Sequence, residues 1–260
     1  MKPIDSIDDL HKILLAMAKV FHQVCVEERI PYYMIAGTQL GATRHKGFIP
    51  WDDDMDFGVP REYFKLIRKV LENKLPEPYH VYGKDDGIVT SGILKICDDR
   101  TIHSHKWDEH PEKQFGVNID IFPLDRVSTM WKRRMADCLM RIQGYKLYSA
   151  SDRPLFKKIS AYIVKTALIG VKSHGLVDFV ESHLVENWGT QITNIYGCYG
   201  AVKETMPQEW YGKPVLNDFE DTQFYGVANP HEYLTHLYGD YMQLPPEEKQ
   251  RHHIVNMYWK

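Results

Sequence analysis

The chain has 260 residues, of which 43% are hydrophobic and 26% charged, and its formal net charge is -3 at pH 7. A chain of this length and composition can bury one substantial core and carry a smaller appended region. Its weak negative charge offers no general attraction to nucleic acid, so an anionic ligand would need a local group of cations or a metal ion. The bulk charge therefore argues against a nucleic-acid-binding module.

The cysteine pattern and the N-terminal segment bear on the cellular compartment. Four widely spaced cysteines form no Cys-x-x-Cys pair, so we expect reduced thiols and neither a disulfide framework nor a zinc site. The first 21 residues carry acids where a signal peptide needs a basic start and an uninterrupted apolar stretch. We therefore expect a cytoplasmic protein.

No window reaches the ~20 apolar residues that a membrane-spanning helix requires. The nearest is LFKKISAYIVKTALIGVK, residues 155–172, which Lys165 interrupts. As a helix it would carry the following residues on one face: Ile159, Tyr162, Ile163, Thr166 and Ile169, with Lys158, Lys165 and Lys172 elsewhere on its surface. Two interpretations stay open: a helix lying on the inner face of a membrane as a peripheral contact, or a core-facing helix, which we favour.

The first elements in chain order are a helix and a short strand. Residues 6–29 begin with Ser6 and Asp9, an approximate capping box, and continue with periodic apolar positions, which predicts a helix. Residues 32–36, YYMIA, predict a buried strand that ends at Gly37. The segment TQLGATRHKG that follows allows a short helix and then a loop.

The next elements alternate strands and helices. Residues 51–59 predict a strand ended by Pro60, and residues 61–75 form a well-patterned amphipathic helix. Further strands are expected at 79–82, at 88–97, and at 117–122, the last ended by Pro123.

From about residue 131 the pattern changes to helices, expected at 131–150, 155–173 and 175–190. The chain therefore predicts an α+β fold with a mixed β-sheet flanked by helices and a mainly helical C-terminal half. We place a catalytic core at residues 1–127. Residues 128–260 would form a region that packs on this core and binds the substrate or acceptor, unless the two form one compact unit.

The residues with the clearest chemistry are the aspartates of WDDDMDF. In an extended segment Asp52, Asp54 and Asp56 would project from one face and Asp53 from the other. Such a carboxylate face suits Mg²⁺, which prefers one or two carboxylates completed by water and phosphate oxygens. A solvated acidic turn is the alternative, but the apolar flanks and the missing glycine and glutamate of a calcium loop favour a metal site.

Asp120 stands alone between Ile119 and Ile121 in an apolar strand, on one face with Asn118 and Phe122. An isolated acid in such a strand needs a compensating partner. It could be a third metal ligand or the base that takes a proton from an acceptor hydroxyl. A salt-bridged carboxylate is the alternative interpretation, and Asp125, in a more turn-like position, is a weaker candidate for the same role.

The segment between the first strand and the aspartates supplies candidates for binding phosphate. Gly37 and Thr38 allow backbone amides to approach a phosphate, and Arg44 and Lys46 follow as cations. Gln39 completes the group of candidate donor-binding residues.

Three blocks together resemble one known family. IAGTQLGATRHKGFIPWDDDMDFGVPR, NIDIFPLD and YLTHLYGDYMQLPPEEKQRHH resemble the LicD family of phosphocholine transferases, which are related to the fukutin-type ribitol-phosphate transferases. The resemblance implies a nucleotidyltransferase-like fold. In it Gly37 and Thr38 match the turn after one strand, Asp54 and Asp56 the acidic pair of the next, and Asp120 a third acid.

The resemblance also implies the reaction and its cofactor. It implies Mg²⁺, or Mn²⁺, held by Asp52, Asp54, Asp56 and Asp120, with Asp54, Asp56 and Asp120 catalytic. The donor would be a CDP-linked alcohol such as CDP-choline, the acceptor a saccharide of a cell-surface glycan or its lipid-linked precursor, and CMP the leaving group. Other residues that match family motifs are candidates for the substrate pocket: Trp51, Asp53, His252 and His253.

Two departures from the family pattern limit these expectations. The interval between Gly37 and the acidic pair is longer than in most nucleotidyltransferases, although it is normal for LicD-like proteins. Residues 128–200 carry no motif that matches the family, and a region that determines acceptor specificity could lie there. The acceptor therefore stays open. The sequence also leaves open whether the group transferred is choline phosphate, another phosphoalkanolamine, a phosphonate analogue or a polyol phosphate.

The mechanism we expect is in-line attack of a sugar hydroxyl on the phosphorus beside the alcohol. Asp120 would orient or deprotonate that hydroxyl, and Arg44 or Lys46 would stabilise the departing CMP. Two alternatives remain: a nucleotidyltransferase that makes a CDP-alcohol from CTP and releases pyrophosphate, and a non-catalytic module that binds a nucleotide or a sugar.

Overall fold

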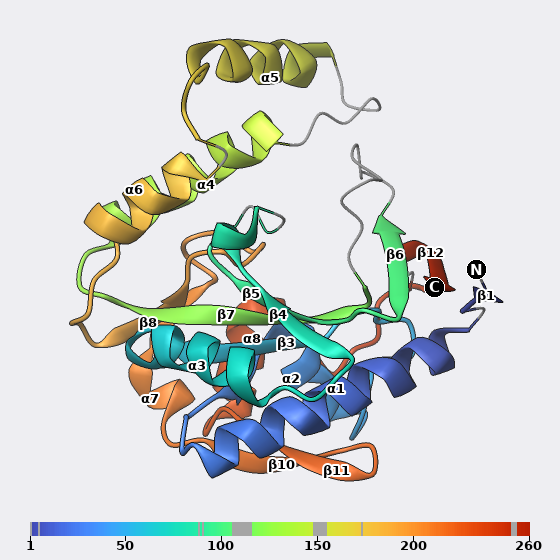
Figure 1. The fold of residues 1–260 in the computed structure, drawn as a ribbon. Helices are drawn as coiled ribbons and strands as arrows, with labels where there is room; N and C mark the ends of the chain where they lie inside the picture. The colour runs from blue at the N-terminus through green and yellow to red at the C-terminus, as the bar shows by residue number, and fades with distance from the viewer. Residues whose placement is uncertain are drawn as a thin grey trace.

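A mixed sheet of seven strands runs through the middle of the molecule (Figure 1). The computed structural model describes residues 2–4, 6–87, 89, 91–105, 116–147, 155–172, 174–250 and 254–260. Five strands follow one another in space in the order β2 (Tyr33–Met34), β3 (Asp56–Pro60), β7 (Asn118–Val127), β5 (Leu94–Asp98) and β4 (Tyr79–Tyr82). The other two are β8 (Gln191–Asn194), which also pairs with β7, and β9 (Thr205–Pro207), which pairs with β8. β3 and β7 are parallel and the other pairs antiparallel. The expected α+β class is confirmed.

β7 is the central strand, and it does not end at Pro123 as we expected. On one side it pairs with β3 from Asp120 to Leu124. On the other side its pairing with β5 ends at Ile121, and its pairing with β8 begins at Leu124. Pro123 therefore lies where one neighbour stops and the next has not begun, so its missing N–H costs no hydrogen bond on that side.

Two helices cover one face of the sheet. α1 (Ile7–Glu27) begins at Ser6, whose hydroxyl accepts a hydrogen bond from the Asp9 N–H, and this confirms the expected cap. α3 (Arg61–Lys74) lies beside it and buries Ile67 and Leu71. The strands turn alternate apolar side chains toward these helices and form the largest core with them. Polar residues of the same strands therefore face the opposite side.

Other segments complete the body of the molecule. α2 (Ala36–Arg44), α7 (Gln208–Tyr211) and α8 (Pro230–Tyr238) share a second apolar cluster with Tyr33 and Leu124. The remaining elements are a small sheet of β1 (Lys2–Pro3), β12 (Ile254–Trp259) and β6 (Thr101–His105), a hairpin of β10 (Val215–Phe219) and β11 (Thr222–Gly226), and the short helices η1 (Lys84–Asp86) and η3 (Glu247–Lys249).

The helices expected after residue 130 are present and lie above the sheet in Figure 1. They are α4 (Met130–Leu147), α5 (Leu155–Ala167) and α6 (Gly175–His183). A third cluster around Ala136 and Val180 packs α4 against α6. From residue 191 the chain returns to strands, two of which extend the central sheet, so the second half is mainly helical only as far as residue 183.

The preferred core-facing interpretation of residues 155–172 is wrong. α5 lies farthest from the sheet in Figure 1, and Ile159, Tyr162, Ile163 and Ile169 are exposed. Periodicity identified the apolar face correctly but could not say whether a neighbour covers it. No helix in the described part of the chain is long and apolar enough to cross a membrane.

Two expected strands are shorter than their sequence patterns. Residues 51–55 are irregular, and β3 begins only at Asp56. β5 begins at Leu94 rather than at residue 88, because the chain bends at Ser91 and Gly92. A Cβ at Gly92 would lie 2.1 Å from the Tyr196 hydroxyl oxygen, so only glycine fits this close approach.

Candidate functional site

A row of charged side chains crosses the sheet on the face opposite α1 and α3. Asp56 of β3 is in register with Asp120 of β7, and Asp120 is in register with Lys95 of β5. The Lys95 Nζ lies 2.6 and 2.8 Å from the two Asp120 carboxylate oxygens. Asn118 Nδ2 donates to the same carboxylate at 2.6 Å. The strand register thus brings together two acids that are far apart in the sequence.

The three aspartates before β3 gather beside this row. Oxygen atoms of Asp52, Asp53 and Asp54 all lie within 4.8 Å of one another. The expectation that Asp53 points away from its neighbours is wrong, because this segment is not an extended strand and alternation does not apply. His11 contacts the Asp52 carbonyl oxygen at 2.7 Å and holds the segment against α1.

The N-terminus of α2 meets the same carboxylates. A Cβ on Gly37 would lie 2.8 Å from an oxygen of the Asp52 carboxylate, so a larger residue here would displace that side chain. The Thr38 hydroxyl accepts a hydrogen bond from the Asp56 N–H at 2.8 Å and fixes the start of β3. The first amides of a helix have no partner within the helix, so those of Gly37 and Thr38 are suited to an anion.

Ala36, the first residue of α2, has a φ of 47°. This left-handed backbone conformation is costly for a residue other than glycine. Its N–H donates to the Tyr233 hydroxyl at 3.0 Å. The strain therefore lies at the junction between the α2 N-terminus and α8.

Ionising all the carboxyl groups of this cluster at once is unfavourable, because they are close together and partly buried. Burial raises the pKa of the Asp56 carboxyl well above its ordinary value, and the charges of Asp54 and Asp120 raise it further. Burial raises the pKa of Asp52 to about 8, with the charges of Asp54 and Asp53 acting in the same direction. A cation bound among these groups would favour their ionised forms.

The donor set of this cluster fits a hard divalent cation. Asp52, Asp54, Asp56 and Asp120 offer carboxylate oxygens, which Mg²⁺ and Mn²⁺ prefer, and the charges of the other three all act on the Asp56 carboxyl. The close group of Asp52, Asp53 and Asp54 adds Asp53 to the residues that could contribute. The sequence placed Asp53 only in the substrate pocket.

Lys95 is the residue of the site that sequence reasoning missed. Burial alone would lower the pKa of its ammonium group, but the adjacent Asp120 carboxylate outweighs this effect and the pKa is raised. The available signal was a single lysine between Leu94 and Ile96 in an apolar strand. Its pairing with Asp120 depends on the β5–β7 register, which the local sequence does not specify.

Three donor-binding candidates follow Thr38 in the sequence: Gln39, Arg44 and Lys46. Gln39 is fully buried, and its amide contacts the Val227 N–H at 3.1 Å and the Thr43 hydroxyl at 3.2 Å. It therefore joins α2 to the segment that follows β11. The Arg44 guanidinium donates to the Tyr241 carbonyl oxygen at 2.7 Å, whereas Lys46 is exposed.

The remaining candidates are Trp51, His252 and His253. Trp51 packs on the second apolar cluster, with its ring edge-on to that of His45 at 6.4 Å between centroids. His252 and His253 lie outside the described residues.

A cavity of about 430 Å³ adjoins the carboxylates on the same side of the sheet. Phe122 of β7 lines it. Phe122 lies two residues after Asp120 in the same strand, so both side chains project from one face of the sheet. Met140 of α4 and Val177 of α6 form the opposite wall. Cys198 lines the cavity too; burial raises the pKa of its thiol, and the nearby charges of Glu204, Asp56 and Asp54 act in the same direction.

A network of ion pairs joins α6 to the start of α3 and to β7, and its residues Arg61, Lys84 and Glu181 line a separate hollow. The guanidinium of Arg61 binds the Asp125 carboxylate at 2.6 and 2.9 Å and Glu181 at 3.0 Å. Glu181 also accepts hydrogen bonds from Lys84 at 2.5 Å and from the Tyr196 hydroxyl at 3.1 Å. Asp125, the weaker candidate for the third acid, is thus the buried partner of an arginine.

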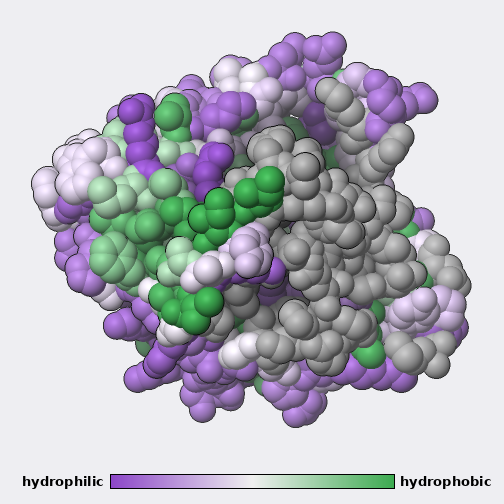
Figure 2. All heavy atoms as spheres, turned by 90° about the horizontal axis from the view of Figure 1, so that it is seen from above, coloured by the Kyte–Doolittle hydropathy of each residue, from purple (hydrophilic) through white to green (hydrophobic). Residues whose placement is uncertain are grey.

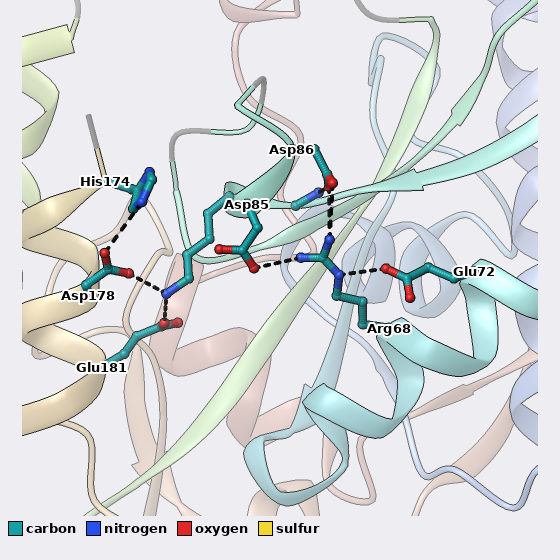
Figure 3. Close-up of polar contacts among 9 residues, drawn as sticks. Arg68, Glu72, Asp85, Asp86, His174, Asp178 and Glu181 are labelled. Carbon is teal, nitrogen blue, oxygen red and sulfur yellow. Dashed lines mark hydrogen bonds and ion pairs between the residues drawn. The ribbon is translucent and has the colours of Figure 1, made fainter. Parts of the chain in front are cut away.

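Figure 3 shows how this network joins α6 to the turn at residues 84–86. Asp178 lies 2.7 Å from the Lys84 ammonium nitrogen and 3.6 Å from His174. On the α3 side, Arg68 pairs with Glu72, Asp85 and Asp86 at 2.9 to 3.2 Å. These pairs fix the position of α6 against α3.

Comparison with known proteins agrees with this architecture. Residues 29–143 match the model of the LicD/FKTN/FKRP nucleotidyltransferase domain. The chain is also 31% identical over 260 residues to the lipopolysaccharide cholinephosphotransferase LicD of Haemophilus influenzae, in an alignment that covers 95% of each protein. The chain belongs to the LicD family. Shorter similarities link this LicD-family chain to uncharacterized proteins of Rickettsia prowazekii (43% over 124 residues, 44% of this chain and 45% of that protein) and Rickettsia typhi (29% over 112 residues, 43% and 34%).

The LicD match contains every aspartate of the cluster, the α2 N-terminus, Lys95 and most of α4. It ends at Gln143, so α5, α6 and the segment around Cys198 lie beyond it. Val177 of α6 and residues 195–198 line the cavity, whereas no described residue of α5 does. The domain model thus includes the charged row but only part of the cavity beside it.

Proposed function

We propose that this LicD-family chain is a metal-dependent transferase. It moves a phosphocholine-type group from a CDP-linked donor to a hydroxyl of a glycan and releases CMP. The observation that carries the proposal is the register of Asp56 with Asp120 beside Asp52, Asp53 and Asp54. The name of the Haemophilus relative, a lipopolysaccharide cholinephosphotransferase, supports choline phosphate as the group and a glycolipid as the acceptor.

Binding of the donor follows from the ends of α2 and β3. Asp52, Asp54, Asp56 and Asp120 would hold Mg²⁺, which neutralises phosphate charge when bound. The amides of Gly37 and Thr38 would bind a phosphate oxygen of the donor. Arg44 lies at the C-terminal end of α2, where its charge would stabilise the departing CMP.

The acceptor hydroxyl would approach Asp120 from the cavity. Lys95 and Asn118 orient the Asp120 carboxylate through three hydrogen bonds of 2.6 to 2.8 Å. Asp120 accepts the proton of the hydroxyl as its oxygen bonds to the phosphorus beside choline. The bond from this phosphorus to the oxygen of CMP breaks, and CMP leaves with the electron pair.

Product analysis tests the proposal. Purified protein is incubated with CDP-choline, MgCl₂ and lipopolysaccharide, and CMP and pyrophosphate are measured, with CTP and choline phosphate in a parallel reaction. CMP formation that requires both metal and lipopolysaccharide supports transfer. Pyrophosphate from CTP would instead support the nucleotidyltransferase alternative, and neither product would support a module that only binds.

A further inference from the structure

α5 presents an apolar face that the described parts of the chain leave uncovered. Tyr162 is 73% exposed, Ile163 59% and Ile159 52%, and Ile169, just after the helix, is 79% exposed. At 100° per residue Ile159, Tyr162 and Ile163 lie within one side of the helix. Figure 2, which looks at the molecule from the side of α5, shows apolar residues gathered on this face. Such a patch marks an interaction surface.

The charge of this segment identifies the kind of partner. Residues 155–172 contain four lysines and no acidic residue, although the whole chain has a net charge of -3. Of these, Lys165 and Lys172 are exposed. Lys165 lies about 60° around the helix from Tyr162, so a basic edge borders the apolar face. An apolar face with a lysine border is typical of helices that lie in the interface of an anionic membrane.

A second copy of this chain fits the surface less well. Pairing two α5 helices through their apolar faces would bring both lysine borders together, and no acid of α5 or the following turn offsets their charge. Like charges at close range oppose association. Anionic lipid headgroups offer the opposite charge along the whole border.

We propose that residues 159–172 bind this protein to the surface of an anionic phospholipid membrane. The apolar face enters the boundary between headgroups and acyl chains, and Lys165 and Lys172 contact the headgroups. α5 packs on α4, and α4 contributes Met140 and Arg141 to the cavity beside the carboxylates. The helix that lines the cavity therefore connects directly to the membrane-binding surface.

Vesicle binding tests this inference without reference to catalysis. The full chain is sedimented with vesicles of phosphatidylcholine alone and with vesicles containing 30% phosphatidylglycerol. We expect binding to the anionic vesicles that weakens at high salt, and at least tenfold weaker binding to phosphatidylcholine. Equal binding to the two compositions, or no binding to either, would overturn the proposal.

Variants assign the binding to α5. Tyr162→Gln with Ile163→Gln should lower the partition coefficient at least tenfold, and Lys165→Gln should lower it about fivefold. Leu66→Gln is a matched control, because Leu66 is a 48% exposed residue of α3. Circular dichroism establishes that each variant is folded. Unchanged vesicle binding in the double variant would contradict the assignment. The assignment would also be wrong if the wild type does not bind vesicles but forms a dimer in light scattering, and the double variant is a monomer.

Discussion

Asp120 carries a positively charged neighbour on one side and an acid on the other. Lys95 and Asn118 hold its carboxylate in one orientation, while Asp56 lies in register across the β3–β7 pair. An isolated acid in an apolar strand would be costly, and the lysine removes much of this cost. Lys95 is therefore a positioning residue for Asp120 in the proposed reaction.

Replacing Lys95 tests this role. Lys95→Gln should lower kcat at least tenfold with little change in KM for CDP-choline, because the amide cannot hold both carboxylate oxygens. The half-buried pair should cost about 1–2 kcal/mol of stability when broken. Lys95→Arg, which keeps the charge, should restore part of kcat. A change in KM alone, or equal activity in the two variants, would exclude positioning.

Glu204 allows a pH test outside the carboxylate cluster. Burial raises the pKa of its carboxyl to about 7 from an ordinary value of 4.5, although the Tyr199 N–H donates to it at 3.1 Å. Between these values the folded state holds more protons than the unfolded state. The free energy of unfolding therefore falls as pH rises from 4.5 to 7.

Glu204→Gln removes this titration and keeps an oxygen for the Tyr199 N–H. We expect the variant and the wild type to unfold with similar free energies near pH 4.5. Above pH 7 the variant should be more stable by up to about 3 kcal/mol, at ~1.4 kcal/mol per unit of pKa. Urea unfolding at pH 4.5, 6 and 8 measures the difference, and a difference independent of pH would contradict the account.

At the scale of elements, α4 connects two surfaces that differ in chemistry. Met140 and Arg141 line the cavity, and α5 packs against the same helix. Gly144 also lines the cavity, and a Cβ there would meet nothing within 4 Å. This glycine keeps space open beside the cavity at a position where alanine would stabilise the helix.

Filling that space tests the acceptor site. Gly144→Ala should raise the stability by about 0.5–1 kcal/mol and leave activity unchanged. Gly144→Leu should raise KM for the lipopolysaccharide acceptor at least fivefold, while calorimetric binding of CDP-choline stays as in the wild type. Reduced donor binding, with the acceptor KM unaffected, would place the donor rather than the acceptor in the cavity.

The sequence predicted those features that depend on residues close together in the chain. Ser6 and the apolar periodicity after it located α1, and the spacing of aspartates located the acidic segment before β3. Strand neighbours are not local, so the Lys95–Asp120 pair could not be predicted. The same limit explains Pro123, which is tolerated because β5 stops and β8 starts on either side of it.

At the scale of the whole molecule, three layers follow one another. α1 and α3 cover one face of the central sheet, the other face carries the charged row and the cavity, and α4, α5 and α6 lie beyond the cavity. The proposed membrane surface is on α5, the outermost helix of this stack in Figure 1. A glycan attached to a membrane lipid would thus reach the cavity from the side of α4 and α5.

The most direct test of the central claim is CMP release from CDP-choline in the presence of lipopolysaccharide and MgCl₂, compared between the wild type and Asp56→Asn. The amide has the shape of the carboxyl but lacks its charge, and the pKa of Asp56 is already raised by burial, so the fold should retain its melting temperature. We expect activity at least a hundredfold lower and no stabilisation by MgCl₂ in a thermal melt, in contrast to the wild type. Near-normal CMP release, or equal stabilisation by MgCl₂ in both proteins, would contradict a metal-dependent transferase centred on these aspartates.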